Sequence, residues 1–155
     1  MTALQKQPTL LLVAGAVIGI AAVGAALVSQ HVFGMEPCPW CILQRLIFLA
    51  ISLACLIGLA VRRFGAALVM LLSLCGIAAA LWQHFKAAAS SSCAMTVADQ
   101  IVIATRLDSL WPDVFLARAS CADAAVSLFG IPYDFYSLAL FVLTGVIGWS
   151  LLRRR

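Results

Sequence analysis

The chain has 155 residues, of which 65% are hydrophobic and 10% are charged, and its formal net charge is +4. Soluble domains carry charge on about a quarter of their residues, so this composition excludes an ordinary soluble domain. The basic residues form no patch that could track a phosphate backbone, and we expect no nucleic-acid partner. The composition is that of a protein whose main partner is a lipid bilayer.

Four apolar segments are long enough to cross such a bilayer. They lie at about residues 10–28, 41–61, 64–81 and 135–152. A span needs about 20 mostly apolar residues, and it must be helical because lipid offers no partners to backbone N–H and C=O groups. We therefore predict an all-α membrane protein in which residues 1–155 form a single membrane domain, a four transmembrane helix bundle. Residues 29–40 and 82–134 would form loops on one side of the membrane.

The charged residues predict the orientation of this bundle. One side would hold Lys6, Arg62, Arg63, Arg153, Arg154 and Arg155, whereas all six acidic residues fall on the other side. By the positive-inside rule, both termini are cytoplasmic and the two loops lie outside the cytoplasm. The first segment could instead be a cleaved signal peptide. Its apolar run exceeds the roughly 7–15 residues of such peptides, so we expect a retained signal anchor.

The six cysteines fall into two classes. Cys55 and Cys75 lie deep in the second and third spans, where we expect them to be small buried hydrophobic side chains. The other four map to the outer loops or their membrane boundary: Cys38, Cys41, Cys93 and Cys121. Disulfides persist in an oxidising envelope, and four thiols allow three pairings. The simplest pairing joins Cys38 to Cys41 and Cys93 to Cys121.

The first pair belongs to the sequence Cys38-Pro39-Trp40-Cys41, at the entrance of the second span. Pro39 suits the first position of a helix, so we expect that helix to begin near Cys38. A helix N-terminus and a nearby cation both favour the reactive thiolate. Arg45 follows Cys41 by four residues and would share its helix face about one turn deeper. The alternative for Arg45 is a side chain that only snorkels to the lipid headgroups.

The second pair spans a long loop. Cys93 lies in a tract of Ala and Ser that leaves it accessible to another protein, and a bond to Cys121 would close a loop of about 28 residues. The alternative is that a Cys93–Cys121 disulfide only stabilises the loop and takes no part in redox chemistry. Between the two cysteines, apolar residues recur at three- and four-residue steps: Val97, Ile101, Ala104, Leu107 and Trp111. This stripe predicts a short amphipathic helix on the membrane surface, with packing against the bundle as the alternative.

Taken together, these features resemble the DsbB family of membrane quinone reductases that make disulfides for the bacterial envelope. The resemblance rests on four spans, the Cys-x-x-Cys that opens the second span, Arg45 four residues later and the loop pair Cys93 and Cys121. Local matches are His31 ahead of Pro37-Cys38, Trp111-Pro112 with Val114-Phe115 before Cys121-Ala122, and His84 at the end of the third span. Two positions depart from the best-known member: Pro39-Trp40 replaces an apolar pair, and Gln44 replaces an acid.

The resemblance implies a thiol:quinone oxidoreductase in the bacterial inner membrane. A reduced periplasmic thioredoxin-fold protein of the DsbA type would attack the Cys93–Cys121 disulfide at Cys93. Cys121 would then exchange with Cys38 and free Cys41, which would pass electrons to a quinone beside Arg45. Ubiquinone is the expected acceptor, with menaquinone as the alternative, and His84 would assist at the quinone site. Proteins of the DsbA type are strong oxidants. A thiol pair of ordinary reduction potential could not reoxidise them, whereas a membrane quinone can.

Three other readings compete with this one. The four loop cysteines could bind a metal ion such as zinc, although such a site would not need Arg45 beside a thiolate. The chain could be a structural bundle with two staple disulfides. It could also be a redox bundle of the vitamin K epoxide reductase type, but in that type the active pair lies at a later helix.

Overall fold

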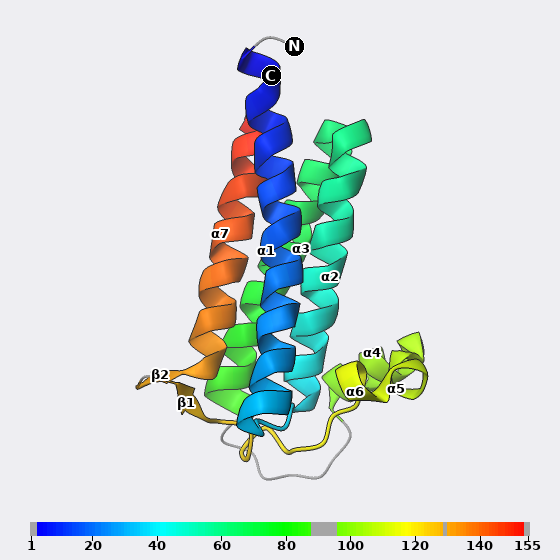
Figure 1. Ribbon diagram of the computed structural model, residues 1–155, viewed down its shortest axis with the longest axis vertical. Coiled ribbons are helices and arrows are strands. Elements are labelled where there is room, and N and C mark those ends of the chain that lie inside the picture. The colour runs from blue at the N-terminus through cyan, green and yellow to red at the C-terminus, as the bar shows by residue number, and fades with distance from the viewer. Residues whose placement is uncertain (1–2, 88–95, 129, 154–155) are drawn as a thin grey trace.

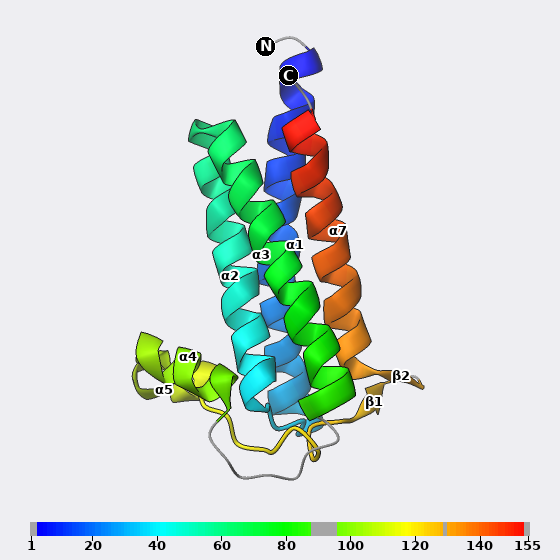
Figure 2. The same ribbon diagram turned by 180° about the vertical axis from the view of Figure 1, so that it is seen from behind.

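Four long helices dominate the computed structural model, which describes residues 3–87, 96–128 and 130–153. They are α1 (Ala3–Phe33), α2 (Pro39–Ala60), α3 (Arg62–Trp82) and α7 (Tyr133–Arg153). Helix α1 packs against α2 and α7, and α3 packs against the same two helices (Figures 1 and 2). All four helices are long and apolar enough to cross a membrane. The structure thus confirms the predicted all-α, four-helix membrane fold.

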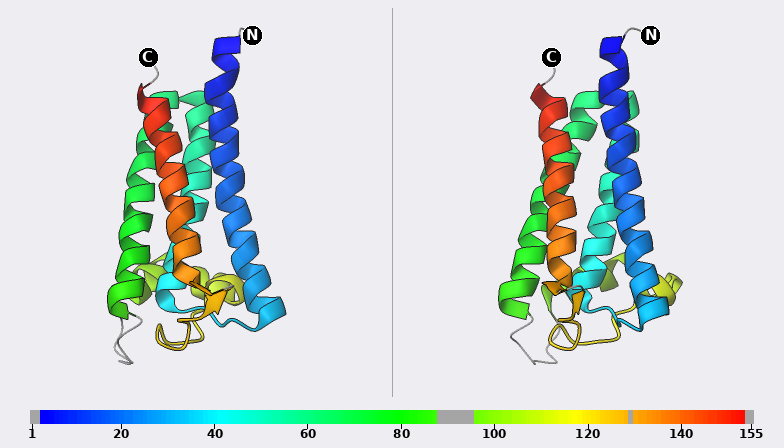
Figure 3. Two further views of the ribbon diagram at one scale, coloured as in Figure 1. Left: turned by 90° about the vertical axis from the view of Figure 1, so that its left-hand side faces the viewer. Right: turned by 60° about the vertical axis from the view of Figure 1, so that its left-hand side comes forward.

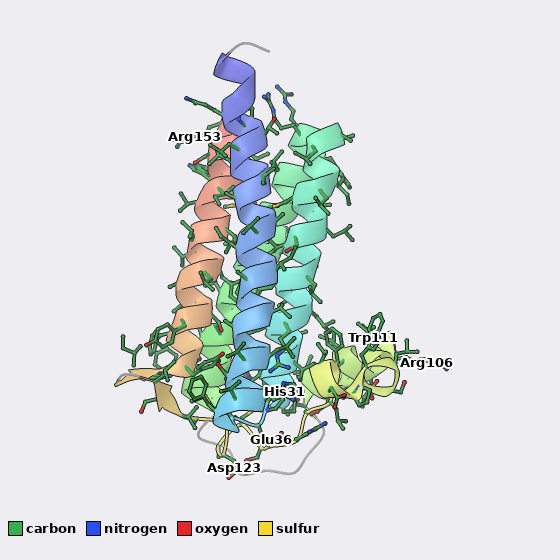
Figure 4. All side chains as sticks on the ribbon, viewed as in Figure 1. His31, Glu36, Arg106, Trp111, Asp123 and Arg153 are labelled. Carbon is green, nitrogen blue, oxygen red and sulfur yellow. The ribbon has the colours of Figure 1, made fainter. Side chains whose placement is uncertain are left out.

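The two ends of the bundle differ in what they carry. The termini and the α2–α3 connection, which is Val61 alone, lie at one end, here called the terminal end (Figure 1). The opposite end, here called the loop end, carries residues 34–38 and the chain between α3 and α7. Figure 4 places Arg153 near the terminal end and Glu36 and Asp123 at the loop end. Each of these three residues lies at the end that the sequence predicts for it.

Small and aromatic side chains set the close packing of the helices. The rings of Phe48 and Phe141 stack with centroids 4.0 Å apart, across α2 and α7. Gly19 leaves room for α2, because a Cβ at this position would collide with Ser52 and with the backbone of Phe48. Figure 3 shows the resulting arrangement, with α7 between α1 and α3. Large apolar side chains cover the outside of the bundle, as expected of a surface that faces lipid rather than water.

One expectation about the buried cysteines is wrong. Cys55 is buried in the core, as predicted, but Cys75 is exposed on the outer face of α3. Ser73 and Gly76 take the inward positions around it, and Gly76 lies against Phe141. Cys75 therefore lies on the same outward face as Leu71 and Leu74.

The long loop folds into short helices and a two-stranded hairpin. A π-helical turn, η1 (Gln83–Ala87), extends α3, and α4 (Val97–Thr105), α5 (Leu107–Leu110) and α6 (Pro112–Phe115) follow. Strands β1 (Ser127–Leu128) and β2 (Ile131–Pro132) pair antiparallel just before α7. Helix α4 begins with a reciprocal cap between Thr96 and Asp99.

The apolar stripe between the loop cysteines is not one continuous helix. Arg106 adopts a left-handed conformation with φ of 55°, which ends α4, so the stripe is divided between α4 and α5, and Trp111 follows α5. Val97, Ile101 and Trp111 of the stripe are exposed, and Figure 4 shows Trp111 beside the bundle. The opposite face packs on the bundle, where Val102 joins a buried cluster with Ile42 and Phe115. Contact of the exposed stripe with lipid stays a prediction.

Candidate active site

The entrance of α2 forms around Cys38 and Pro39. The sulfur of Cys38 caps the helix by accepting the backbone N–H of Cys41 at 3.2 Å, and Pro39 is the first helical residue. The turn before it uses Gly34, whose φ of 66° is accessible to glycine without strain. The predicted start of the second span near Cys38 is thus confirmed.

Three of the four predicted redox cysteines meet at this entrance. The sulfurs of Cys38 and Cys41 lie 2.6 Å apart, and both thiols are free. Cys121 packs against Cys38 together with Trp40, Cys41 and Ala124. Cys38 is 0% exposed and Cys121 is 8% exposed, so water has little access to this cluster. Cys93 lies outside the described residues.

Backbone hydrogen bonds bring the distant Cys121 segment to the start of α2. The carbonyl of Pro37 accepts the N–H groups of Arg118 at 3.0 Å and Ala119 at 3.3 Å. A tight turn follows, in which the Ser120 hydroxyl donates to Asp123 at 2.6 Å and accepts the Asp123 N–H at 3.2 Å. These bonds satisfy the carbonyl of Pro37, which is a buried residue. They also hold Cys121 where its sulfur can exchange with Cys38.

Hydrogen bonds distribute the protons unequally between these two thiols. Hydrogen bonds with Cys121 and Cys41, together with burial, raise the pKa of Cys38 far above its usual value. The hydrogen bond from Cys38 lowers the pKa of Cys121, and the backbone N–H of Trp40 lowers it further. Cys38 is therefore the proton donor, and Cys121 carries the thiolate character that nucleophilic attack on sulfur requires.

A cavity of about 880 Å³ opens beside the thiol cluster, between the loop ends of the helices. Its walls are mostly small or apolar side chains, among them Ala22, Phe48 and Leu140. Cys41 and Arg45 both line it, so a molecule inside could touch the sulfur and the guanidinium at once. An apolar pocket of this size with a few convergent polar groups is typical of a small-molecule site.

Arg45 is held inside the protein and does not extend to the surface. It is 5% exposed, and its Nη1 donates to the Gln30 side chain at 2.9 Å and to the Val114 carbonyl at 2.7 Å. Its Nε is buried and has no hydrogen-bond partner among the described residues. No acidic side chain in the described part of the chain forms an ion pair with it. These contacts disfavour the snorkelling alternative, and Arg45 is one of the residues that line the cavity.

His84 occupies a position beside the cavity and does not line it. Its Nδ1 lies 2.8 Å from Oδ2 of Asp134, and Asp134 does line the cavity. The imidazole also meets the ring of Phe135 edge-on, with centroids 4.7 Å apart. His84 could therefore reach a bound molecule only through Asp134 or by moving. Its predicted role in binding a quinone stays a prediction.

Two further polar residues belong to this site: Gln44, noted in the sequence only as a departure from the family pattern, and Gln83, which sequence reasoning missed. Gln44 donates to Gln83 at 2.7 Å, and Gln83 donates to the sulfur of Cys41 at 3.5 Å. The signal for Gln44 was available, because a polar residue within an apolar span usually has a function or a partner. The signal for Gln83 was weaker, since it lies at the end of α3, where polar side chains are ordinary.

The described residues contain no group of three or more His, Cys, Asp or Glu side chains that could hold a metal ion. The thiols instead contact one another, as disulfide exchange requires. Fold and site together define a multi-pass membrane protein with a cluster of thiols at one end of a helical bundle.

Comparison with known proteins names the family. The family model described as "Disulfide bond formation protein DsbB" matches residues 8–151. The chain is 35% identical to "Disulfide bond formation protein B" of Pseudomonas syringae pv. tomato, over 93% of this chain and 88% of the relative. It is 37% identical to "Disulfide bond formation protein B 1" of Pseudomonas savastanoi pv. phaseolicola over the same shares. The chain belongs to the DsbB family of membrane disulfide bond formation proteins.

Proposed function

We propose that the chain is a thiol:quinone oxidoreductase that reoxidises a DsbA-like dithiol protein and passes its electrons to a membrane quinone. One observation carries the proposal. A buried cluster of three thiols lies against an apolar cavity, and Cys41 belongs to both. The cluster supports exchange between sulfurs, and the cavity supports transfer to an apolar acceptor.

The proposed relay begins in the loop. A thiolate of the reduced partner attacks Cys93 of a Cys93–Cys121 disulfide, forms a mixed disulfide and releases Cys121 as a thiolate. Cys121 then attacks the sulfur of Cys38 in a Cys38–Cys41 disulfide, and Cys41 leaves as a thiolate. The second thiol of the partner releases Cys93, which attacks Cys121 and frees Cys38. The partner has then lost two electrons and two protons, and Cys38 and Cys41 have gained them.

The contact of Cys121 with Cys38, and the backbone N–H of Trp40 that lowers the pKa of Cys121, support the second step. An attacking sulfur must be a thiolate and must reach its target; Cys121 would be released as a thiolate in the first step, and it packs against Cys38. The leaving sulfur, Cys41, lies near the N-terminus of α2 and accepts a hydrogen bond from Gln83. Both features favour a negatively charged leaving group.

A quinone fits the cavity in chemical terms. Its ring and apolar tail would match the apolar wall, and Arg45 would meet a carbonyl oxygen. When bound, a quinone accepts two electrons and two protons. Cys41 would place its reduced sulfur against the bound molecule. Arg45, whose Nε has no hydrogen-bond partner among the described residues, would stabilise negative charge that develops on that molecule. Ubiquinone is the proposed acceptor, and menaquinone is the alternative.

The function requires a particular orientation. We place the loop end in the periplasm and both termini in the cytoplasm of a bacterial inner membrane. The basic residues at the terminal end support this orientation, because Arg62, Arg63 and Arg153 resist translocation. The thiols would then face the oxidising compartment.

A turnover assay tests the proposal. The purified chain is mixed with a reduced DsbA-like protein and ubiquinone, and quinone absorbance is followed. We expect wild-type protein to consume quinone, Cys41→Ser to show none of this activity, and Cys55→Ser to keep it as the matched cysteine control. Absence of turnover in wild type, or full turnover in Cys41→Ser, would refute the proposed function.

A further inference from the structure

Two buried glutamines form a hydrogen-bond chain that ends on the sulfur of Cys41. Gln44 lies in α2 and is 4% exposed, and Gln83 begins η1 and is 7% exposed. The Gln44 amide nitrogen donates to Oε1 of Gln83 at 2.7 Å, and Nε2 of Gln83 donates to Cys41 at 3.5 Å. Both residues also line the cavity. Buried amides of this kind are costly unless they are paired, so their alignment on one sulfur needs an explanation.

The direction of the hydrogen-bond chain decides which end of the Gln83 amide faces the sulfur of Cys41. Because Oε1 of Gln83 is occupied by Gln44, the NH₂ group is the end that faces the sulfur. An N–H donor stabilises a thiolate more than a thiol. A neutral amide does so without adding a charge that could pair with Arg45 and weaken its effect on the cavity. A carboxylate in the same place could not donate, and it would repel the thiolate.

We propose that Gln83 is a further catalytic residue, which donates a hydrogen bond to the Cys41 thiolate, and that Gln44 is the positioning residue that fixes the direction of the Gln83 amide. The inference rests on the proposed function, in which Cys41 leaves a disulfide as a thiolate. Gln44 in α2 and Gln83 in η1 would together stabilise the Cys41 thiolate before its electrons pass to the quinone.

The amide chain can also serve the protonated state. If both amides turn over, the Cys41 thiol donates to Oε1 of Gln83, and Nε2 of Gln83 donates to Gln44. An amide carries both a donor and an acceptor, so the same two side chains match either state of the sulfur. Gln44 and Gln83 can thus hydrogen-bond to Cys41 whether it is protonated or not, and neither glutamine changes its own charge.

The test measures how fast Cys41 reacts, without any quinone. Fully reduced, full-length protein in detergent is treated with iodoacetamide across a pH series, and modification of Cys41 is read by peptide mass spectrometry. Gln83→Met keeps the size of the side chain but removes the donor. We expect it to slow modification of Cys41 about tenfold at neutral pH and to move the pH profile up by about one unit. Gln83→Glu should shift the profile at least as far, because it adds a like charge.

Two further variants complete the test. Gln44→Met leaves Gln83 in place but frees its amide to turn, so we expect a smaller shift in the same direction. It also keeps the inference testable if Gln83→Met does not fold. Gln100→Met, at an exposed position of α4, is the matched control and should follow the wild-type profile. A wild-type profile for Cys41 in folded Gln83→Met or Gln44→Met would overturn the inference.

Failure of this inference is distinguishable from failure of the proposed function. If Cys41 reduces no quinone in wild-type protein, the proposed function fails whatever the alkylation profiles show. If quinone reduction depends on Cys41 but the glutamine variants leave its pH profile unchanged, only the role of the glutamines fails. A structural role alone would lower thermal stability without moving the profile of Cys41 relative to that of Cys121.

Discussion

Residue contacts at the start of α2 give each sulfur a different chemical character. Cys38 holds its proton, because hydrogen bonds with Cys121 and Cys41, together with burial, raise its pKa. Cys121 gains thiolate character from the same hydrogen bond. Cys41 alone of the three also lines the apolar cavity. In the function proposed above, these differences suit one sulfur to proton donation, one to attack and one to contact with the acceptor.

The contact between Cys38 and Cys121 predicts a pH effect. The hydrogen bond from Cys38 lowers the pKa of Cys121, which favours the reactive thiolate of Cys121 in fully reduced protein. Cys38→Ala removes the hydrogen bond, so the pKa of Cys121 should rise and its alkylation rate at neutral pH should fall several-fold. Alkylation of Cys121 read by mass spectrometry checks this, with Cys55→Ala as the control. An unchanged rate in Cys38→Ala would contradict the assigned hydrogen bond.

The buried guanidinium predicts a second residue-scale effect. Arg45→Met should lower kcat/KM for quinone about 100-fold, because a preorganised donor at the site of developing charge is lost. One round of exchange between the dithiol partner and the chain, measured without quinone, should stay within about twofold. Arg106→Met, an exposed substitution in the loop, is the control. A loss of exchange as large as the loss of quinone reduction would show that Arg45 acts only by holding the fold.

At the scale of elements, close helix contacts position the site. The loop ends of α1, α2 and α7 must approach to form the cavity, and small residues farther along the helices allow this approach. The Cys121 segment is tied separately, through the carbonyl of Pro37. The bundle therefore fixes Cys41 and Arg45, and backbone bonds in the loop fix Cys121.

Two glycines in α1 provide a matched test of this packing. Gly19→Ala would drive a Cβ into Ser52 and the backbone of Phe48, whereas a Cβ at Gly24 would meet nothing within 4 Å. We expect Gly19→Ala to destabilise the protein by about 1–3 kcal/mol and Gly24→Ala to be neutral or slightly stabilising. Thermal unfolding in detergent measures both. Equal melting temperatures for the two variants would contradict the close α1–α2 contact.

At the scale of the whole molecule, hydrophobic runs were sufficient to predict four helices in a membrane. The segment lengths were underestimated, since α1 continues to Phe33 and α7 begins at Tyr133, where polar residues extend a helix without interrupting its backbone bonds. The approach of Cys121 to Cys38 was anticipated from the tethering of the loop near the bilayer and from the family resemblance. Two sets of hydrogen bonds were not predictable, because each joins segments far apart in sequence. One runs from Arg118 and Ala119 to the Pro37 carbonyl, and the other runs from Gln44 through Gln83 to Cys41. The break at Arg106 was missed, since Arg rarely adopts a left-handed conformation.

Orientation is the whole-molecule property that the function needs most. In a chain without its native cysteines, Glu36→Cys and Arg63→Cys place single thiols at exposed positions of the loop end and the terminal end. A membrane-impermeant maleimide added to spheroplasts should label the first and leave the second unlabelled until the membrane is broken. The reverse pattern would put the thiol cluster on the cytoplasmic side and contradict the orientation proposed above.

The central claim is that Cys41 delivers electrons to a quinone, and a single-turnover measurement tests it most directly. A Cys93→Ala/Cys121→Ala variant keeps the inner pair, and it is reduced, freed of reductant and mixed with ubiquinone in the absence of oxygen. The account predicts one quinol per chain and a new Cys38–Cys41 disulfide, with neither product when Cys41 is also changed to Ser. No quinol from the reduced inner pair, or equal quinol without Cys41, would contradict it.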